Sequence, residues 1–209
     1  MKKVLILAMT LVLMSGVCAA SPLTDYSQGK AAIDIDFYPS GDMDLNGKGF
    51  DGKSSNMAGS VTVGIGNDFA VQYRQSDWEA SLAPYKAKIN TQQFNLLYKV
   101  NKNVSAFAGF SKTSLGRLVE DGELKGPNQT DWQVGLIGSK QIAKKTTAYA
   151  LAAMGSDIRN WEVGVSYAFA KNVEFNVMYR DFRADNLAWG GHSVDAEVKG
   201  IGYGLTFKF

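Results

Sequence analysis

From Lys30 to the last residue, apolar side chains recur at every second position of the chain. This period is that of a β-strand, whose successive side chains point to opposite faces, and no helical period competes with it after Ala20. The alternating runs number about ten, and each is close to the roughly 9 to 11 residues that a tilted strand needs to cross a bilayer. They are residues 31–38, 57–65, 69–76, 93–100, 104–112, 132–139, 147–154, 161–169, 173–180 and 199–209. The pattern predicts an all-β fold, a closed antiparallel transmembrane β-barrel of about ten strands, with eight as the alternative because residues 140–160 alternate weakly.

Composition agrees with this fold class. The 209 residues are enough for one domain, with 20% charged and 45% apolar residues, so the chain is neither disordered nor a helical membrane protein. The 22 glycines, the 11% of aromatic residues and the small number of prolines, 4, favour strands joined by tight turns.

The connections between the runs are alternately short and long. Three-residue turns are predicted at 66–68, 101–103 and 170–172, and a slightly longer one at 140–145. Apart from the short connection at 155–159, the intervening segments are long and polar, and span 39–56, 77–90, 113–130 and 181–194. Short turns at one end and long loops at the other are typical of bacterial outer-membrane barrels, in which the short turns are periplasmic.

Two hairpins can be aligned residue by residue. A turn at 170–172 gives the apolar pairs Phe169/Val173, Tyr167/Phe175, Val165/Val177 and Val163/Tyr179, and on the other face Ser166/Asn176, Gly164/Met178 and Glu162/Arg180. A turn at 66–68 gives Ile65/Phe69, Val63/Val71 and Val61/Tyr73, and on the other face Thr62/Gln72 and Ser60/Arg74. A slip of one residue would mix apolar and polar side chains on both faces, so the pattern itself predicts the register.

Alternation does not decide which face of the barrel points inward, and a soluble lipocalin-like barrel would enclose the apolar one. The polar face, however, combines charges with small residues, which suit a narrow lumen, namely Gly64, Gly109, Gly135, Gly164, Gly202 and Gly204. Aromatic residues gather near the strand ends of the apolar face, as in the interfacial girdles of membrane barrels. The predicted girdle is Phe37, Tyr73, Tyr98, Trp132, Trp161, Tyr167, Phe169, Tyr179 and Phe207. We therefore expect lipid to contact the apolar face.

The charged residues of the predicted inner face form a candidate lumen network. Its members are Asp34, Asp36, Arg74, Lys99, Glu162, Glu174, Arg180 and Lys208. An unpaired charge in a narrow interior is costly, so neutralising pairs are expected: Glu162 with Arg180, and Asp34 and Asp36 beside the strand that carries Lys208. Two interpretations stay open, a polar core that plugs the barrel and a constricted pore whose charges select the solute.

The first 20 residues have the three parts of a secretory signal peptide. Lys2 and Lys3 precede an apolar run, Val4 to Met14, that is too short to span a bilayer, and small residues follow as far as Ala20. We expect cleavage after Ala20. The expected division of the chain is a signal peptide at 1–20, a short periplasmic N-terminal segment at 21–29 and the barrel at 30–209.

Cleavage would change the charge balance and the cysteine content. The chain has 22 basic and 20 acidic residues, and loss of Lys2 and Lys3 leaves 20 of each, so no nucleic-acid partner is indicated. The only cysteine, Cys18, would also leave, so the exported fold must be stable without disulfides. In the alternative, Cys18 is retained as a lipid-bearing N-terminus, but lipoprotein signals prefer a small residue before the cysteine, and here it is Val17.

The C-terminal run gives the resemblance to a known family. The ending GYGLTFKF places Tyr203, Leu205, Phe207 and Phe209 on alternate positions and resembles the last strand of bacterial outer-membrane β-barrel proteins. The similarity covers the architecture from about Lys30 to the end, in the manner of the small porin-like and OmpA-transmembrane-domain-like proteins. It implies an outer-membrane location with periplasmic termini and extracellular loops, and a lipid environment. It further implies that periplasmic chaperones and the barrel-assembly machinery, which reads the terminal aromatic strand, act on the chain during biogenesis.

Two long loops contain further candidates. Asp42, Asp44 and Asn46, with Gly47, match the first half of a calcium loop, but Lys53 stands where a bidentate glutamate belongs, so a polar surface turn is the ordinary interpretation. In the segment 116–126, Asp121-Gly122 is a type I′ hairpin signal, which predicts two strands extended above the membrane, with possible docking residues Leu118, Val119 and Leu124 at the tip.

An enzymatic interpretation depends on the single histidine, His192, which is followed by Ser193, Asp195 and Glu197. Neighbours on a strand point to opposite sides, so His192 and Ser193 are not expected to act together, and no catalytic residues, cofactor or metal are predicted. We expect a non-enzymatic barrel, either a narrow or plugged pore for small solutes or a structural surface component. An adhesin or ligand receptor acting through loops 39–56 and 113–130 is the alternative, and a lipid-modifying enzyme is the less favoured one.

Overall fold

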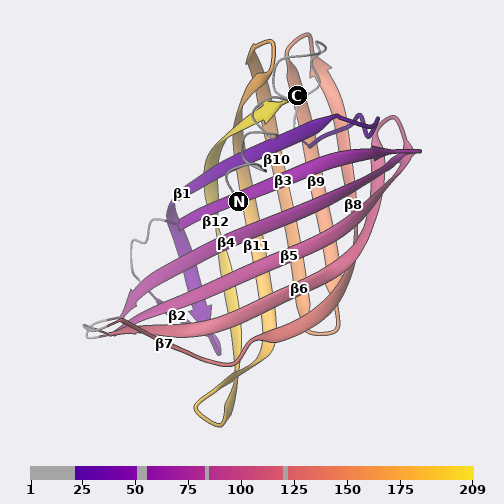
Figure 1. Ribbon diagram of the computed structural model, residues 1–209. Coiled ribbons are helices and arrows are strands. Elements are labelled where there is room, and N and C mark those ends of the chain that lie inside the picture. The colour runs from indigo at the N-terminus through magenta and orange to yellow at the C-terminus, as the bar shows by residue number, and fades with distance from the viewer. Residues whose placement is uncertain (1–21, 51–55, 83–84, 120–121) are drawn as a thin grey trace.

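The computed structural model describes residues 22–50, 56–82, 85–119 and 122–209. Within them the chain forms one antiparallel sheet that closes on itself, because the last long strand pairs with the first (Figure 1). The long strands are β1 (Ala31–Leu45), β3 (Asn56–Gly66), β4 (Phe69–Leu82), β5 (Tyr85–Asn101), β6 (Val104–Val119), β8 (Gln129–Ala143), β9 (Thr146–Gly155), β10 (Ile158–Ala170), β11 (Val173–Trp189) and β12 (His192–Lys208). Each of the ten alternating runs falls on one of these strands, so the ten-stranded barrel is confirmed and the eight-stranded alternative is wrong. The expected signal peptide lies outside the described residues.

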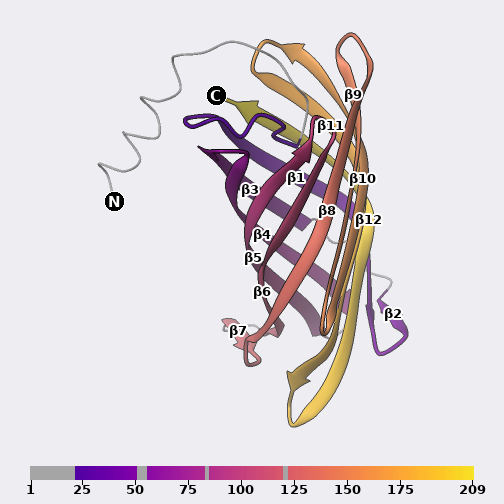
Figure 2. The ribbon, with the colours of Figure 1, turned by 90° about the vertical axis from the view of Figure 1, so that its right-hand side faces the viewer.

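The two ends of the barrel differ. The turns at 67–68, 102–103, 144–145 and 171–172 and the end of the C-terminal strand lie at one end, which we call the turn end, and the β11–β12 hairpin projects from the opposite, loop end (Figure 1). In the side view, β3 to β6 form one wall and β9 to β12 the other (Figure 2). The described part of the chain contains no helix long and apolar enough to cross a bilayer.

Much of the polar sequence predicted as long loops is strand. Strand β1 continues into the predicted loop 39–56, and β11 and β12 leave only a short turn in the predicted loop 181–194. Short strand β2 (Lys48–Phe50) pairs with β1. Short strand β7 (Gly122–Lys125) pairs with β6 and confirms the predicted extension at 116–126, although Gly122 lies in β7 opposite Val119 and not in the turn. In these extensions the alternation is reversed. Inward positions carry apolar side chains, such as Trp78, Ile89 and Phe182, that form a buried cluster, whereas the outward positions extend beyond the bilayer and are mostly polar.

The predicted registers are confirmed except beside the turns. Val63 pairs with Val71 and Glu162 lies opposite Arg180, as predicted. Next to the turns, however, Phe69 pairs with Gly66 and not with Ile65, and Val173 pairs with Ala170 and not with Phe169. In the first hairpin Asn67 and Asp68 have φ of 53° and 63°, which makes the turn a two-residue type I′ turn with a bulge beside it.

The barrel is polar inside and apolar outside, which excludes the lipocalin-like alternative. Large apolar side chains on the outer face are exposed, among them Val61, Leu96, Leu136, Val163 and Ile201. Buried positions include many polar side chains, such as Thr91, Gln133 and Asn176. Only a bilayer gives such an outer face an apolar solvent, so this is a membrane-spanning barrel.

The inward-facing glycines make room for inward-facing aromatic rings. A Cβ atom added to Gly135 would overlap the ring of Phe107 and lie 2.5 Å from the carbonyl oxygen of Ala152. At Gly164 it would lie 2.5 Å from the Tyr149 ring, and at Gly202 2.6 Å from the ring of Tyr38. The glycines of the polar face therefore let bulky rings fill the lumen.

The N-terminal segment before β1 is part of the barrel interior. Leu23 and Tyr26 are 7% and 2% exposed and pack with Ala70, Leu97 and Phe107 inside the turn end. The segment predicted as a short periplasmic one, 21–29, is thus packed into the mouth of the lumen where it is described.

Candidate functional site: the charged layer of the lumen

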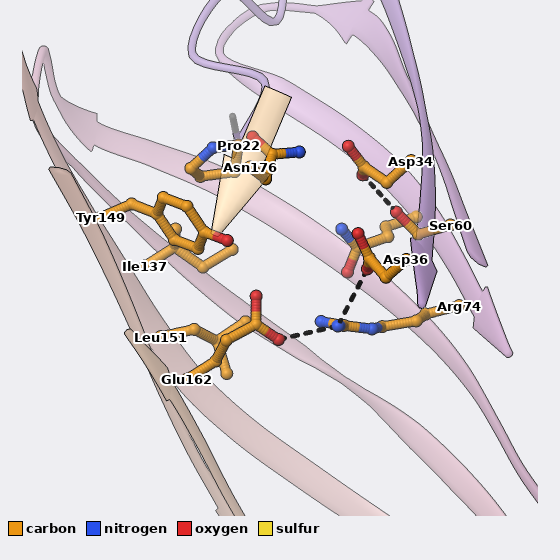
Figure 3. Close-up of a pocket in the computed structure, with 11 residues that line it drawn as sticks. Pro22, Asp34, Asp36, Ser60, Arg74, Ile137, Tyr149, Leu151, Glu162 and Asn176 are labelled. Atoms are coloured by element: carbon orange, nitrogen blue, oxygen red, sulfur yellow. Dashed lines mark hydrogen bonds and ion pairs between the residues drawn. The ribbon is translucent and has the colours of Figure 1, made fainter. Parts of the chain in front are cut away.

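An arginine and two carboxylates meet in the middle of the lumen. Arg74 on β4 donates from Nη2 to Oε2 of Glu162 on β10 at 2.7 Å, and the same nitrogen lies 3.7 Å from Oδ2 of Asp36 on β1 (Figure 3). All three side chains are nearly inaccessible to solvent. The contact spans the lumen, since β4 and β10 are not neighbours in the sheet. Buried charges are stable when they are paired in this way.

The expected pair of Glu162 with Arg180 does not form, although the two residues are register partners. Arg180 instead donates from Nε to Oδ1 of Asn160 at 3.2 Å, and its guanidinium lies 5.7 Å from the ring centroid of Phe182. The partner of Glu162 is Arg74, which reaches it from across the barrel. Arg180 is fully buried, and its Nη1 and Nη2 atoms make no hydrogen bond within the described residues.

The last strand contributes a second ion pair, but not with the carboxylates of β1. Lys208 donates from Nζ to Oε1 of Glu174 at 2.9 Å. Asp34 accepts hydrogen bonds from the hydroxyls of Ser60 and Thr206, each at 2.5 Å. The expectation that Lys208 would neutralise Asp34 or Asp36 is therefore corrected: Lys208 is register partner of Ala32, one inward position closer to the turn end than Asp34.

Lys99, the remaining member of the predicted network, lies on β5 near the turn end, opposite Ser105, and is half-buried. It follows Leu97 on the inward-facing positions of the strand and is thus separated from the layer around Arg74 by an apolar residue.

A small cavity adjoins the charged layer on the turn-end side. Its volume is about 40 Å³, room for a few water molecules at most. Three carboxylates and one guanidinium line it, together with Gln72, Asn176 and Pro22 of the N-terminal segment; the charged members are Asp34, Asp36, Arg74 and Glu162 (Figure 3). The Oδ1 atom of Asn176 is buried and has no hydrogen-bond partner among the described residues.

The lumen is filled on both sides of this layer, and strand β4 shows the order. Ala70 belongs to an apolar cluster at the turn end, Arg74 to the charged layer, and Trp78 and Ala80 to a larger apolar cluster at the loop end. The loop-end cluster also contains Phe182. The sequence analysis did not predict these inward aromatic residues because it considered aromatic residues only on the outer face. The available signal was an aromatic residue at an inward-facing strand position close to an inward-facing glycine.

The loop end is also closed by contact across the barrel. Strand β6 touches β11, which is not its sheet neighbour. The Gln129 side chain donates to the carbonyl oxygen of Asp185 at 3.2 Å, and a Cβ on Gly126 would lie 3.0 Å from the carbonyl oxygen of Ala188.

The predicted girdle residues lie on the outer face. The exposed rings are Phe37, Tyr73, Tyr98, Trp132, Trp161, Tyr167 and Phe169, while Tyr179 and Phe207 are half-buried. Trp161 packs against Tyr179 with ring centroids 5.1 Å apart, and Phe69 against Tyr98 at 5.0 Å.

The predicted assembly signal lies where the barrel closes. Tyr203 and Leu205 are exposed on the outer face, and Phe207 and Phe209 are half-buried. The backbone of Phe209 exchanges two hydrogen bonds with Ala31, at 2.9 and 3.1 Å.

The remaining candidates lie at the loop end. Asp42 and Asp44 are in strand β1, and the Asn46 side chain accepts from the backbone N–H of Asp195 at 2.8 Å, so the described part of the calcium motif is a hairpin turn and not an ion-binding loop. Lys53 of that motif lies outside the described residues. No group of three or more metal-ligating side chains is found in the described part of the chain.

The histidine and its neighbours lie in the β11–β12 hairpin at the loop end. His192 begins β12 and is exposed, and the hydroxyl of Ser193 donates to Oδ1 of Asn186 at 3.2 Å. Asp195 accepts from the backbone N–H of the same Asn186 at 3.0 Å. Of the predicted docking residues in the 116–126 extension, Leu124 is exposed, while the side chains of Leu118 and Val119 lie outside the described part.

Comparison with known proteins identifies the fold. No protein-family model and no curated sequence matches this chain. Among solved structures, the outer membrane protease OmpT from Escherichia coli matches with a TM-score of 0.57 at 11% identity, over 91% of this chain and 99% of that one. Neisserial surface protein A (NspA) matches at 0.45 and 15% identity over 86% and 96%, and the translocator domain of autotransporter NalP from Neisseria meningitidis at 0.48 and 9% over 100% and 94%.

The likeness to OmpT carries the fold argument. The resemblance and the fold class predicted from the sequence are confirmed: the chain has the fold of the bacterial outer-membrane β-barrels. A closed barrel of this fold with an apolar outer face is an integral protein of the outer membrane, in contact with its lipid.

Proposed function

We propose that this chain is a non-enzymatic outer-membrane barrel with a closed lumen, a surface component of the membrane and not a pore for solutes. One observation carries the proposal, namely that the lumen is filled in three successive layers. Tyr26 and Phe107 fill the turn end, Arg74 and Glu162 cross the middle, and Trp78 contributes to the apolar cluster that fills the loop end. The same observation favours the plugged-core interpretation of the lumen charges over the selective pore.

A conducting path would have to break each layer in turn. At the loop end, water would have to wet side chains such as Trp78 and Phe182, which are 1% exposed, and hydrating buried apolar surface is unfavourable by about 25 cal/mol per Å². In the middle, an ion would have to displace a paired guanidinium and carboxylate in a medium of low dielectric constant.

The orientation follows from the outer-membrane convention. The turn end, with residues 22–30 and the C-terminal strand, faces the periplasm, and the loop end with the long hairpins faces outside. We expect the girdle residues to lie at the level of the lipid headgroups. The terminal strand with Phe209 is the segment that the barrel-assembly machinery and periplasmic chaperones handle during insertion.

A second candidate function is recognition of a ligand or a surface by the strand extensions at the loop end. It is favoured by the exposed charges beyond Trp161 on β10 to β12, where Arg183 binds Asp185 at 2.6 Å and lies 3.8 Å from Asp195, and Arg159 lies 3.5 Å from Asp185. Replacing Arg159 and Arg183 together by glutamine would remove binding to a surface if these charges mediate it, and shortening the segments 39–56 and 113–130 tests the other loop-end extensions in the same assay.

The experiment for the main proposal is single-channel recording of the purified, refolded protein in a planar bilayer. Heat-dependent gel migration first establishes that the barrel is folded. We expect no current above that of the protein-free bilayer at any salt concentration. Discrete steps in proportion to the salt concentration would overturn the proposal and make Arg74, Glu162 and Asp36 candidates for selectivity residues.

A further inference from the structure

The segment 22–30 occupies the mouth of the lumen at the turn end. Leu23 and Tyr26 point into the apolar cluster formed with Ala70, Leu97 and Phe107 from three different strands. Tyr26 is 2% exposed, which is unusual for a residue that precedes the first strand of a barrel. The packing explains why the strand residues at this level are apolar although they face the lumen.

Specific hydrogen bonds hold the segment to the wall. The Tyr26 hydroxyl donates to Oγ of Ser105 on β6 at 3.0 Å. The backbone N–H groups of Gly66 and Gly64 on β3 donate to the carbonyl oxygens of Tyr26 and Lys30, at 3.0 and 2.8 Å. The bond between Gly64 and Lys30 extends the β1–β3 ladder by one residue beyond Ala31 and Val63, so the segment is attached through its backbone as well as through its side chains.

Gly64 lies directly against the backbone of the segment. A Cβ atom at this inward-facing position would lie 2.5 Å from the carbonyl oxygen of Ser27 and 2.7 Å from the carbonyl carbon of Tyr26. Both atoms belong to the backbone of the segment and cannot rotate away, so any side chain at position 64 must displace it. A glycine is required here by the close approach of another backbone.

The far side of the segment forms a wall of the charged cavity. Pro22 is one of the residues that line the cavity together with Asp34, Asp36, Arg74 and Glu162 (Figure 3). The segment therefore stands between these charges and the water at the turn end, while the loop-end cluster shields them from the other side.

We propose that residues 22–30 are an internal plug that closes the charged cavity to the periplasm. The plug is held by the close contact of its backbone with Gly64 and by the burial of its own Tyr26. Displacing the plug opens the cavity to water and small solutes from the turn end only. The inference deepens the proposed closed lumen, of which the plug is one layer, and the two have separate tests.

The test measures access to the cavity with a cysteine reporter. Ser60 lines the cavity, is 7% exposed and is replaced conservatively by cysteine; Cys18→Ser removes the only natural cysteine. Folded protein in detergent is treated with methyl methanethiosulfonate, and modification of Ser60→Cys is followed by mass spectrometry. We expect slow modification with the plug in place, and a rate at least about tenfold higher when Gly64→Val displaces it, because opening of the site then no longer limits reaction.

The matched control is Gly138→Val, since a Cβ at Gly138 on β8 meets no atom within 4 Å. Its modification rate should equal that of the parent. Deletion of residues 22–28 is the second route to an open mouth and should give the same high rate as Gly64→Val, with folding checked by heat-dependent migration.

Equal modification rates in the parent and the deletion variant, or rapid modification of the parent, would overturn the plug. Currents through the unmodified protein would overturn the closed lumen instead. The modification rate therefore tests the plug, and the bilayer current tests the closed lumen.

Discussion

At the residue scale, the arrangement of the lumen depends on one arginine. Arg74 is 8% exposed as a residue, and its Nη2 atom contacts both Glu162 and Asp36. Its Nε atom has no hydrogen-bond partner among the described residues, so the two carboxylates are the interactions that compensate its lost hydration. Removing one of them leaves a charge that the barrel interior cannot solvate.

Glu162→Gln should therefore destabilise the folded barrel by about 3 kcal/mol, the low end of the cost of breaking a buried pair. The matched control is Glu79→Gln, which removes the exposed carboxylate of the Lys88–Glu79 pair, at 3.7 Å, and should change stability by less than about 1 kcal/mol. Urea-dependent unfolding in lipid vesicles, followed by tryptophan fluorescence, measures both. Equal effects of the two substitutions would show that the Arg74–Glu162 pair contributes nothing specific.

The partner of Arg74 could not be read from the sequence, although its inward direction could. Alternation decides the face of each side chain, and the turn position decides its neighbours on adjacent strands, which is why Glu162 was placed opposite Arg180. The contact between Arg74 and Glu162 joins residues 88 positions apart across the lumen. It depends on the cross-section of the closed barrel, which no local pattern encodes.

At the element scale, glycine positions decide how closely strands and rings approach one another. Strand β8 carries two glycines in opposite situations, since Gly135 faces the Phe107 ring inside the lumen and Gly138 meets nothing. The sequence predicted small residues for the inner face but not the rings that use the space. It predicted the ten strands from their membrane-spanning halves, and missed their extensions because the apolar residues there change from the outer to the inner face.

Gly135→Val should destabilise the barrel by about 1 to 3 kcal/mol, the usual cost of overpacking. A branched side chain there would meet the Ala152 carbonyl oxygen at 2.5 Å, which is fixed in the sheet, and the Phe107 ring, which is held in the turn-end cluster. Gly138→Val on the same strand should be neutral or slightly stabilising, because valine favours strands. The same urea titration compares the two, and a neutral Gly135→Val would mean that the ring and the backbone give way without cost.

At the scale of the whole molecule, the barrel is closed by several independent layers, so no single one controls passage through it. The plug, the Arg74 layer and the loop-end cluster follow one another along the same lumen, and each excludes water from the next. The resulting expectation is a series arrangement, in which opening one layer changes local access and leaves the through-path closed.

Deletion of residues 22–28 should accordingly leave planar-bilayer currents at baseline while it exposes the cavity at the turn end. The loop-end cluster around Trp78 and Phe182 is unchanged by the deletion and still prevents ions from crossing. Adding Phe182→Ala to the deletion removes a buried ring from that cluster and should also leave the current at baseline, because the Arg74–Glu162 pair still crosses the middle of the lumen. Steady currents from the deletion by itself would contradict the series arrangement and would make the N-terminal segment the sole barrier in the lumen.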